Sequence, residues 1–421
     1  MIVLLNGTSS AGKTTLARAV QDALPSPCLL VGIDTVVYAL PERYLNADWA
    51  HMFSYEHDAD GRISRVTPTE YGHRLVRGLH AAVAGLAHAG LDVIVDHVVF
   101  DRVVADDLAD RWRGLDVLRV KVDCPREVVE RRERDRADRT LGQAGALAEV
   151  AHVSYDLTVD TGEADPEACA AQVVAALWDR RLLGQLARDH ARLRTVAARD
   201  LAAPVPDCPG WTVEDLVRHV ANGYRNVVVR RLTGTPEEDL GPDPMVALDR
   251  GYAAMAEVFA ADDPARQVGA DPAETVRTWI RRMAHEIVVH RLDAERAVGE
   301  PAAPVESDIA ADGVAEALAI FLRYSTHAWT GQFAADLTEW RDRWLLVSCG
   351  YGPSWRVSVH PSGVEVEPAV DGGADASVRA EPLDLMRWLY GRAGGGPVAV
   401  DGDRALVDQV SRLLRTATGV G

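Results

Sequence analysis

The sequence has few cysteines and no long apolar run. None of its apolar stretches approaches the roughly 20 residues that a membrane-spanning helix needs, so we expect no membrane segment. The start, MIVLLNGTSSAGK, has no basic leader and runs directly into a glycine-rich loop, so we do not expect export. The five cysteines are odd in number, far apart and without a C-x-x-C pair, which argues against a disulfide framework or a cysteine zinc site and favours a reducing cytoplasm.

Acidic residues outnumber basic ones by 63 to 45, and lysine is almost absent. The formal net charge is -18 at pH 7, and no block of Lys and Arg stands clear of acidic neighbours. Such a chain repels phosphate backbones, so we expect a small-molecule substrate rather than nucleic acid, and we leave a homo-oligomer open. Of the 45 basic residues only Lys13 and Lys121 are lysines, so Lys13 stands out in a chain that otherwise uses arginine.

The pattern along the chain changes twice, and 421 residues are too many for one ordinary core, so we expect three domains. Residues 1–178 alternate short apolar runs with helical segments, which predicts an α/β domain with a parallel sheet between helices. Residues 182–332 carry long amphipathic helices with Pro/Gly-rich breaks, which predicts an all-α four-helix bundle. Residues 335–421 mix strand-like runs with two helices, which predicts a small α+β domain.

A phosphate-binding loop follows the first apolar strand. The segment GTSSAGKT matches G-x-x-x-x-G-K-[ST] and leads into the helical run TTLARAVQDAL. Backbone amides of such a loop surround phosphate oxygens, Lys13 reaches the β- and γ-phosphates, and the Thr14 hydroxyl binds Mg²⁺. The alternative, a chance glycine-rich turn, does not explain why strand, helix and rare lysine coincide. The predicted ATP·Mg²⁺ site comprises Gly7, Thr8, Ser9, Ser10, Ala11, Gly12, Lys13, Thr14 and Thr15.

Two aspartates end predicted strands on the ligand-binding side of the sheet. Asp34 closes the run CLLVGID, and Asp96 closes LDVIVD. Ligands bind at the carboxyl ends of the strands in open α/β sheets. A carboxylate there either accepts the proton of an attacking hydroxyl or holds Mg²⁺ through water, and the residues alone leave the two roles open. The alternative for each is an ordinary helix N-cap.

Arginines cluster in the run ERRERDRADR after the fourth predicted strand, where P-loop kinases carry a mobile lid. The planar guanidinium binds phosphate through two hydrogen bonds and keeps its proton, so these arginines would neutralise charge on a transferring phosphoryl group. The alternative is a solvated helix of ion pairs, which we prefer for Arg131 and Arg134. The candidates for the nucleotide site and its lid are Arg132, Arg136 and Arg139.

Residues 1–178 resemble the chloramphenicol phosphotransferase family, small P-loop kinases that phosphorylate a hydroxyl of an antibiotic. The resemblance follows, in order, NGTSSAGKTT, LLVGIDTVVYALP, VIVDHVVF, the spacing of the arginines and HVSYDLTVDT. It implies that Asp34 is the general base for the acceptor hydroxyl and that Arg136 and Arg139 are lid arginines. It also implies that Lys13 acts on the nucleotide.

The resemblance does not extend to the acceptor. Residues 42–66, ERYLNADWAHMFSYEHDADGRISRV, are this chain's own, and the corresponding region contributes to the acceptor pocket in the family. The resemblance therefore does not identify an antibiotic as the acceptor of this chain. The choice between ATP and GTP is equally open.

A second constellation lies in the predicted bundle. Glu286 and His290 are spaced i, i+4 in RRMAHEIVVHRLDAE, which places both on one helix face. His219, in WTVEDLVRHV, would complete a site where two imidazoles and one carboxylate hold a metal ion and leave a fourth position open. On spacing alone, such residues are more often surface groups or satisfied core groups.

The segments CPGWTVEDLVRH, RRMAHEIVVHRLDAERAVGEP and DIAADGVAEAL resemble the mycothiol-dependent maleylpyruvate isomerase family, whose DinB-like bundle holds a metal with His, Glu and His. The resemblance implies a divalent ion, Zn²⁺ in the first instance, at His219, Glu286 and His290, which would lower the pKa of a thiol such as mycothiol. His285 and Asp293 are either partners of these ligands or exposed helix residues. ASVRAEPLDLMRWLYGR and VAVDGD are similar to the sterol-carrier-like C-terminal domain of the same family.

Together these patterns predict an ATP-dependent small-molecule kinase fused to a metal-dependent, thiol-linked isomerase or transferase. The kinase would serve antibiotic resistance or tailoring chemistry. In one alternative the bundle carries the catalytic activity, as a thiol-dependent isomerase or transferase, and the P-loop domain regulates it. Another makes the bundle a non-catalytic module that binds the compound modified by the kinase.

Overall fold

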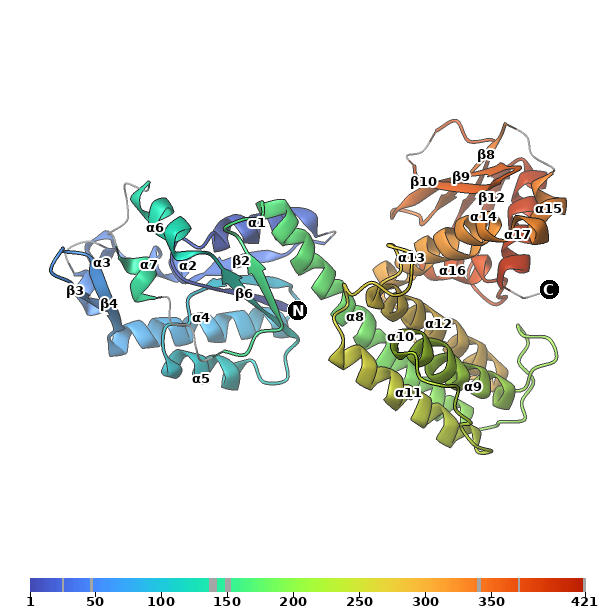
Figure 1. The fold of residues 1–421 in the computed structure, drawn as a ribbon, viewed down its shortest axis with the longest axis horizontal. Helices are drawn as coiled ribbons and strands as arrows, with labels where there is room; N and C mark the ends of the chain where they lie inside the picture. The colour runs from blue at the N-terminus through green and yellow to red at the C-terminus, as the bar shows by residue number, and fades with distance from the viewer. Residues whose placement is uncertain are drawn as a thin grey trace. The chain divides into compact units, whose positions relative to one another are not determined.

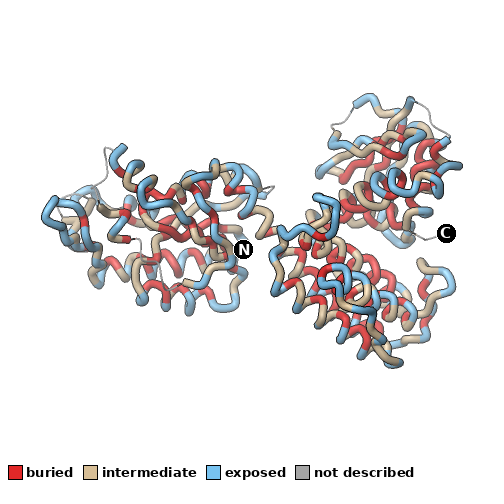
Figure 2. The backbone as a smooth tube through the Cα atoms, viewed as in Figure 1, coloured by how far each residue is buried: buried red, intermediate tan, exposed pale blue. Residues whose placement is uncertain are grey.

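The structure is a computed structural model of the chain and describes residues 1–24, 26–45, 48–135, 142–147, 153–338, 342–369 and 372–418. It forms two compact units, Met1–Trp178 and Asp179–Gly421 (Figure 1). Within the described ranges, no helix is both long enough and apolar enough to cross a bilayer. Buried residues concentrate in the strands of each unit and along the helix faces that cover them (Figure 2).

The first unit is built on a five-stranded sheet with the order β2-β5-β1-β6-β7. Every neighbouring pair is parallel, and in the central strand Leu4 lies opposite Val95 of β5 and Arg119 of β6. All residues of β1 are buried, as expected for a strand covered on both faces. The predicted parallel sheet is therefore confirmed. The strands are β1 (Ile2–Asn6), β2 (Leu29–Gly32), β5 (Val93–His97), β6 (Val117–Asp123) and β7 (Leu157–Asp160).

Helices cover both faces of this sheet. On one face, α1 and α8 contribute Leu16 and Val173 to the core, and on the other, α4 and α5 contribute Leu79 and Leu108. A hairpin, β3 (Phe53–His57) with β4 (Ile63–Pro68), stands apart from the sheet. The helices are α1 (Lys13–Ala23), α2 (Ile33–Val37), α3 (Glu42–Leu45), η1 (Trp49–His51), α4 (Glu70–His88), α5 (Arg102–Arg111), α6 (Arg126–Arg134), α7 (Gln143–Ala146) and α8 (Pro166–Ala197).

The second unit opens with the helical domain expected from the amphipathic pattern. The side chains of Thr212, Asp243 and Thr275 cap α9, α11 and α12 by accepting hydrogen bonds from backbone amides of the first turn. Two segments are π-helical, a form found frequently at functional sites. The elements are α9 (Val213–Asn222), η2 (Gly223–Val229), α10 (Arg230–Thr233), α11 (Pro244–Ala261), α12 (Val276–Ala297), α13 (Ser307–Glu316), η3 (Ala317–Tyr324), α14 (Ser325–Ala328) and α15 (Thr330–Leu337).

A small sheet domain completes the second unit, as predicted. Its strand order is β10-β9-β8-β11-β12, with β8 and β11 parallel and the other pairs antiparallel. Val288 of α12 and Val314 of α13 belong to the same hydrophobic cluster as Leu345 and Val378 of this sheet, so the helices and the sheet share one core. The elements are β8 (Trp344–Ser348), β9 (Ser354–His360), β10 (Gly363–Pro368), β11 (Ala376–Arg379), α16 (Pro382–Leu389), β12 (Ala399–Gly402) and α17 (Arg404–Thr418).

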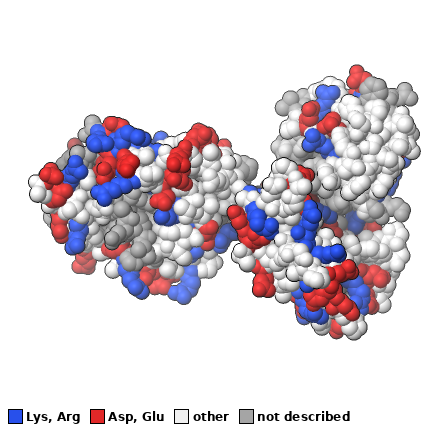
Figure 3. Space-filling model, viewed as in Figure 1, with Lys and Arg blue, Asp and Glu red and all other residues white. Residues whose placement is uncertain are grey.

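Charged side chains of both signs are interspersed on the face drawn in Figure 3, but some ion pairs are buried, among them a network around Arg291. Arg291 of α12 is fully buried, with Nε 3.1 Å from Asp189 Oδ1 of α8 and Nη1 2.8 Å from Glu295 Oε2. The same Nη1 donates to the Ala303 carbonyl at 2.8 Å. Removing one partner of a buried pair leaves a charge without compensation, so this network ties α8 to α12.

Replacing Arg291 with methionine should destabilise the second unit by about 3–5 kcal/mol, because Asp189 would stay buried without the guanidinium that pairs with it, and Glu295 would keep only one cation, Arg192, whose Nε lies 2.8 Å from its Oε1. The matched control is Arg230→Met, since the Arg230 side chain is 55% exposed and pairs with the exposed Glu237 at 3.5 Å. An exposed pair of this kind contributes less than about 1 kcal/mol. Urea unfolding followed by circular dichroism measures both changes. Equal losses in the two variants would show that the buried network does not stabilise the fold.

Candidate functional site

The loop between β1 and α1, residues 7–12, has the backbone geometry of a phosphate-binding loop. At Gly7 no side chain fits, because an added Cβ would lie 2.4 Å from the Val122 carbonyl oxygen of β6. Gly12, with φ 89°, occupies the N-cap position of α1 in a left-handed conformation that favours glycine. The loop amides and the N-terminus of α1 are therefore placed to surround an anion.

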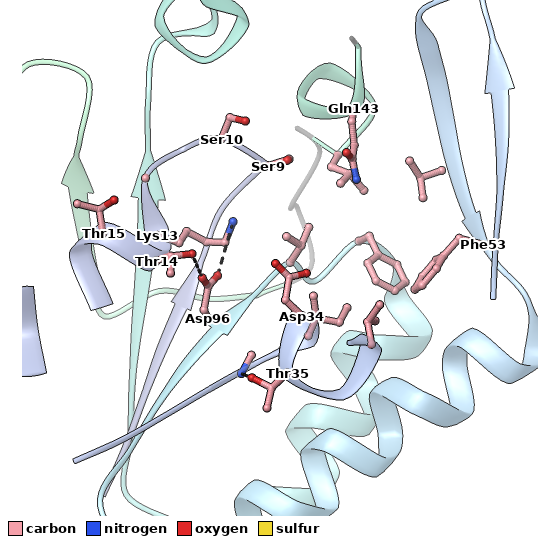
Figure 4. A pocket seen from close by; sticks show the side chains of 18 of the residues that line it. Ser9, Ser10, Lys13, Thr14, Thr15, Asp34, Thr35, Phe53, Asp96 and Gln143 are labelled. Atoms are coloured by element: carbon pink, nitrogen blue, oxygen red, sulfur yellow. Dashed lines mark hydrogen bonds and ion pairs between the residues drawn. The ribbon is translucent and has the colours of Figure 1, made fainter. Parts of the chain in front are cut away.

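The structure brings Lys13, Thr14 and Asp96 together at this loop (Figure 4). The Thr14 hydroxyl donates to Asp96 Oδ2 at 2.5 Å, and Lys13 Nζ lies 3.8 Å from Asp96 Oδ1. Lys13 is only 7% exposed, and its Nζ donates to the Thr8 carbonyl at 2.8 Å. Asp96 lies within β5 and caps no helix, so the N-cap alternative does not hold for it.

Asp34 lies on the other side of the same cavity, which has a volume of about 370 Å³. It occupies the first turn of α2, whose N-cap is Gly32, so Asp34 is not an N-cap either. Figure 4 shows the Asp34 carboxylate and the Lys13 ammonium facing this common space. The two aspartates are thus separated in position: Asp96 sits beside Thr14, and Asp34 sits away from it.

Aromatic side chains form much of the remaining wall. Trp49 and Phe53 have ring centroids 5.4 Å apart, and Phe53 and Phe100 meet edge to face at 6.0 Å. Tyr55 lines the same cavity, and Figure 4 shows Phe53 across it from Lys13. The Trp49 Nε1 atom is buried and has no hydrogen-bond partner among the described residues. Three of these rings come from the segment whose role the sequence left open.

A second cavity, of about 350 Å³, lies on the other side of the loop. Arg132 lines it, and its Nη2 donates to the Thr161 carbonyl at 2.8 Å. The Thr161 hydroxyl donates in turn to the Ala11 carbonyl at 2.5 Å, which holds this wall against the loop. The residues that line the cavity are Ser10, Gly12, Thr15, Leu16, Arg132, Asp135, Thr161, Ala164 and Pro166.

The other arginines of the predicted lid divide into two groups. Arg131 and Arg134 are exposed on α6, as a solvated helix requires. Arg136 and Arg139 lie outside the described residues, so their predicted role stays a prediction.

Glu133, within the arginine run, is a residue that sequence reasoning missed. It is 2% exposed and accepts hydrogen bonds from the Gly142 amide at 2.9 Å and the Ala144 amide at 2.8 Å. It thereby anchors α7, which carries Gln143 to the cavity wall (Figure 4). The run ERRERDRADR holds four acids and five arginines, so no pattern in it singled out Glu133 or the amides that it binds.

In the second unit, the three predicted metal ligands converge. Glu286 Oε1 lies 3.2 Å from His219 Nε2 of α9 and 3.0 Å from His290 Nε2 of the same helix, α12. One ligand atom from each residue lies within 4.8 Å of the other two, a spacing that suits a single ion with bonds of about 2 Å. Burial alone would lower the pKa of His290, but the Glu286 carboxylate raises it to about 9.

Asp293 and Arg392 support His290 from behind. The Nδ1 atom of His290 lies 3.1 Å from Asp293 Oδ2, and the Asp293 side chain is 1% exposed. Arg392, which follows α16, holds that carboxylate with Nε 3.1 Å from Oδ1 and Nη2 2.9 Å from Oδ2. A carboxylate on Nδ1 fixes the imidazole ring and directs the Nε2 lone pair toward an ion. Asp293 is therefore a partner of His290, a predicted ligand, as one of the two interpretations held.

Arg282 contacts Glu286, whereas the neighbouring His285 pairs with Asp312. Arg282 hydrogen-bonds to Glu286 and lies 3.2 Å from Glu316 Oε2. Burial would raise the pKa of Glu286, but Arg282 and His290 hold it well below its usual range, so the carboxylate is anionic. His285 is fully buried and pairs with Asp312 at 2.7 Å, so it is neither an exposed residue nor a partner of the three ligands.

Comparison with known proteins finds family matches in both units. A model of the chloramphenicol phosphotransferase-like protein family matches residues 1–178. The chain is 34% identical over 167 residues to a Mycobacterium tuberculosis H37Rv protein named "Putative O-phosphotransferase", with 38% of this chain and 74% of that protein covered. The chain belongs to the chloramphenicol phosphotransferase-like family. The phosphotransferase-like unit is followed by matches to the mycothiol maleylpyruvate isomerase N-terminal domain at residues 182–295 and to the MDMPI C-terminal domain at residues 308–409.

Two solved structures are similar to parts of the chain at low identity. A sugar kinase from Janibacter sp. HTCC2649 is 20% identical, with a TM-score of 0.32, over 42% of this chain and 93% of that one. A mycothiol-dependent maleylpyruvate isomerase is 16% identical, with a TM-score of 0.35, over 53% of this chain and 92% of that one. The family matches confirm the predicted order, a phosphotransferase-like unit followed by isomerase-like domains.

In the isomerase-like domains, Arg392→Gln should weaken the retention of a divalent ion about tenfold or more, because Asp293 would lose the cation that fixes it behind His290. The matched control is Arg387→Gln on α16, where Nη1 lies 3.9 Å from Asp384 Oδ1. Plasma mass spectrometry of zinc per chain, after dialysis against graded chelator, measures retention. If Arg392→Gln keeps its ion as firmly as the control, Arg392 does not support the ligand.

Proposed function

We propose that the chain is an ATP-dependent kinase that transfers the γ-phosphate to a hydroxyl group of a small, uncharged molecule. One observation carries the proposal: Lys13, Asp34 and an aromatic wall line a single cavity beside the phosphate-binding loop. The family match and the O-phosphotransferase relative support phosphotransferase chemistry in general. The nature of the acceptor is argued from the cavity itself.

We infer the part of each residue in the transfer from its position in the cavity. The loop amides and Lys13 bind the β- and γ-phosphates. Thr14, paired with Asp96 at 2.5 Å, offers hydroxyl and carboxylate oxygens of the kind that hold Mg²⁺, whose charge would offset that of the phosphates. Asp34 accepts the proton of the acceptor hydroxyl as its oxygen attacks the γ-phosphorus. The new O–P bond forms while the bond to ADP breaks, and ADP leaves with the electron pair.

The cavity wall favours an acceptor without charge. Among the described residues that line it, Lys13 and Arg18 are the cations, and both belong to α1 on the nucleotide side. An anionic acceptor would therefore find no further cation among the described lining residues, whereas the rings of Phe53 and Phe100 bury apolar surface. The enclosed Trp49 N–H would donate to an acceptor oxygen. These features suit an apolar alcohol with a second oxygen, such as an antibiotic or a comparable metabolite.

A phosphate-transfer screen of hydroxylated antibiotics and metabolites tests this function. We expect Asp34→Asn to lower kcat by about 10²- to 10⁴-fold, because the hydroxyl proton loses its acceptor, while MgATP still binds. The matched control is Asp60→Asn, an exposed residue in the β3–β4 hairpin. If Asp34→Asn transfers phosphate at the wild-type rate, Asp34 is not the general base, and Asp96 is the next residue to test.

We also propose that the second unit binds a divalent ion, Zn²⁺ in the first instance, at His219, Glu286 and His290. The convergence of the three donor atoms and the match to the isomerase domain support this site. An ion bound there would lower the pKa of a thiol ligand, so mycothiol or a related thiol would react as thiolate. Three protein ligands leave the position that such a thiol needs.

Lys13→Ala distinguishes two activities from one regulated activity. We expect this variant to lose phosphate transfer, because the β- and γ-phosphates lose their ammonium partner, and to keep thiol-dependent turnover and bound metal. Assays of both reactions with and without ATP measure this. Thiol-dependent turnover that needs ATP and fails in Lys13→Ala would make the P-loop unit a regulator. A wild-type chain without metal or thiol-dependent turnover would leave the bundle as a ligand-binding module.

A further inference from the structure

Gln143 adds a side-chain amide to the wall of the cavity that holds Lys13 and Asp34. The residue begins α7 and is half-buried, and its side chain makes no hydrogen bond to any described residue. The rings of Phe53 and Phe100 make the wall beside it largely apolar. A ligand that covers an amide without offering it a hydrogen bond costs free energy, because the amide loses its water. A molecule bound in this cavity therefore needs a group that pairs with Gln143.

The Gln143 side chain extends into the space in front of Asp34. Figure 4 shows the two side chains entering the cavity from opposite walls, Gln143 from α7 and Asp34 from α2. Asp34 is the proposed base, so the reacting hydroxyl of the acceptor lies against its carboxylate. Gln143 therefore faces the part of the acceptor that is next to this hydroxyl.

Hydrogen bonds on both sides hold Gln143 in place. The Glu133 carboxylate accepts from the Gly142 amide at 2.9 Å and from the Ala144 amide at 2.8 Å. The Thr8 hydroxyl donates to the Ala144 carbonyl. Because Glu133 is only 2% exposed, water competes little for its hydrogen bonds. The residues before and after Gln143 are thus fixed to α6 and to the phosphate-binding loop.

Gly142 ties the same segment to the β3–β4 hairpin. Its φ is 98°, a left-handed conformation that favours glycine, and an added Cβ would lie 2.4 Å from the Ile63 carbonyl oxygen of β4. Strand β4 pairs with β3, which carries Phe53 and Tyr55. The hairpin therefore positions Gln143 relative to the aromatic rings, as a site that selects one kind of molecule requires.

The Gln143 amide offers a hydrogen-bonding capacity that the Trp49 N–H lacks. Its Oε1 accepts a hydrogen bond without carrying a charge, whereas the Trp49 N–H can only donate. The group that satisfies Oε1 is a neutral donor, namely an amide N–H or a second hydroxyl. A carboxylate offers Oε1 no proton, and it would lie near the like charge of Asp34.

We propose that Gln143 selects the acceptor by accepting a hydrogen bond from a neutral donor group next to the reacting hydroxyl. The inference rests on the kinase function proposed above and adds a second group to the acceptor. A site with a hydrogen-bonding group discriminates against a molecule that lacks the partner, because the group then stays covered and unpaired. The acceptor is thus a ring-bearing alcohol that also carries an amide or a second hydroxyl. Gln143 takes no proton in the transfer, so it determines specificity.

Three probes with one skeleton test the selection: mandelamide, methyl mandelate and mandelate. Each carries a phenyl ring and one secondary hydroxyl, and only mandelamide adds a neutral N–H. With MgATP, the wild type should phosphorylate mandelamide with a kcat/KM about three- to tenfold above that for methyl mandelate, as one neutral hydrogen bond allows. Mandelate should be the poorest of the three, because its carboxylate gives Oε1 no proton and meets the charge of Asp34.

Two variants and a control assign the preference to Gln143. Gln143→Leu should abolish the preference for mandelamide over methyl mandelate, because it removes Oε1. Gln143→Lys should raise kcat/KM for mandelate about tenfold, because it places a cation beside the carboxylate. The matched control is Gln172→Leu, an exposed glutamine on α8 that should keep the wild-type order of the three probes.

The kinase function and the selection by Gln143 can fail separately. If Gln143→Leu keeps the wild-type ratio of mandelamide to methyl mandelate, or slows all three probes alike, Gln143 selects nothing and only this inference falls. A wild type that prefers methyl mandelate or mandelate overturns it too. If the wild type binds MgATP but phosphorylates none of the probes, the acceptor class inferred here is wrong. If it does not bind MgATP, the kinase function itself falls.

Discussion

The parallel pairing of β1 with β5 determines the geometry of the first site. In that register Leu5 lies opposite Asp96, and the phosphate-binding loop begins two residues later, at Gly7. The pairing therefore brings Asp96 within 2.5 Å of the Thr14 hydroxyl across 82 residues of sequence. A slip of one residue would turn Asp96 to the opposite face of the sheet. The same strand thus sets both the loop that would surround the phosphates and the carboxylate beside its metal-binding threonine.

In the second unit, helix α12 determines the geometry of the predicted metal site. One face of this helix carries Glu286 and His290, while its Val288 packs into the core shared with the C-terminal sheet. The chain beyond α16 supplies Arg392, so the orientation of His290 depends on how the sheet domain packs against the helix. Burying the Arg392–Asp293 ion pair costs desolvation free energy, so the pair is poorly explained as a source of stability. It is better explained by its effect on His290, whose imidazole ring it holds in one orientation.

Most features predicted from the sequence lie within one segment, and the exception is His219 of α9, which meets Glu286 of α12 across 67 residues. The loop GTSSAGKT and the i, i+4 pair in α12 are readable because a few neighbouring residues determine their backbone, and the apolar runs predicted the parallel sheet, which is confirmed. Contacts between distant segments left no such pattern. Arg392 meets Asp293 across 99 residues, and Glu133 binds the Gly142 and Ala144 amides across a run that reads as charged helix. The aromatic wall likewise depends on where the short helix η1 (Trp49–His51) and the β3–β4 hairpin place their rings.

Arg291 and Lys13 show that the two kinds of cation suit different buried positions in this chain. Arg291 bridges Asp189 and Glu295 inside the bundle, and a planar guanidinium with several N–H groups suits that task in a way that a compact ammonium does not. At Lys13 a compact ammonium suits the site better than a planar guanidinium. The side chain is 7% exposed and reaches the Thr8 carbonyl within its own loop, where a planar fork would need more room. A small ammonium on a flexible stem can leave that carbonyl for a phosphate oxygen, so lysine persists here in a chain that otherwise prefers arginine.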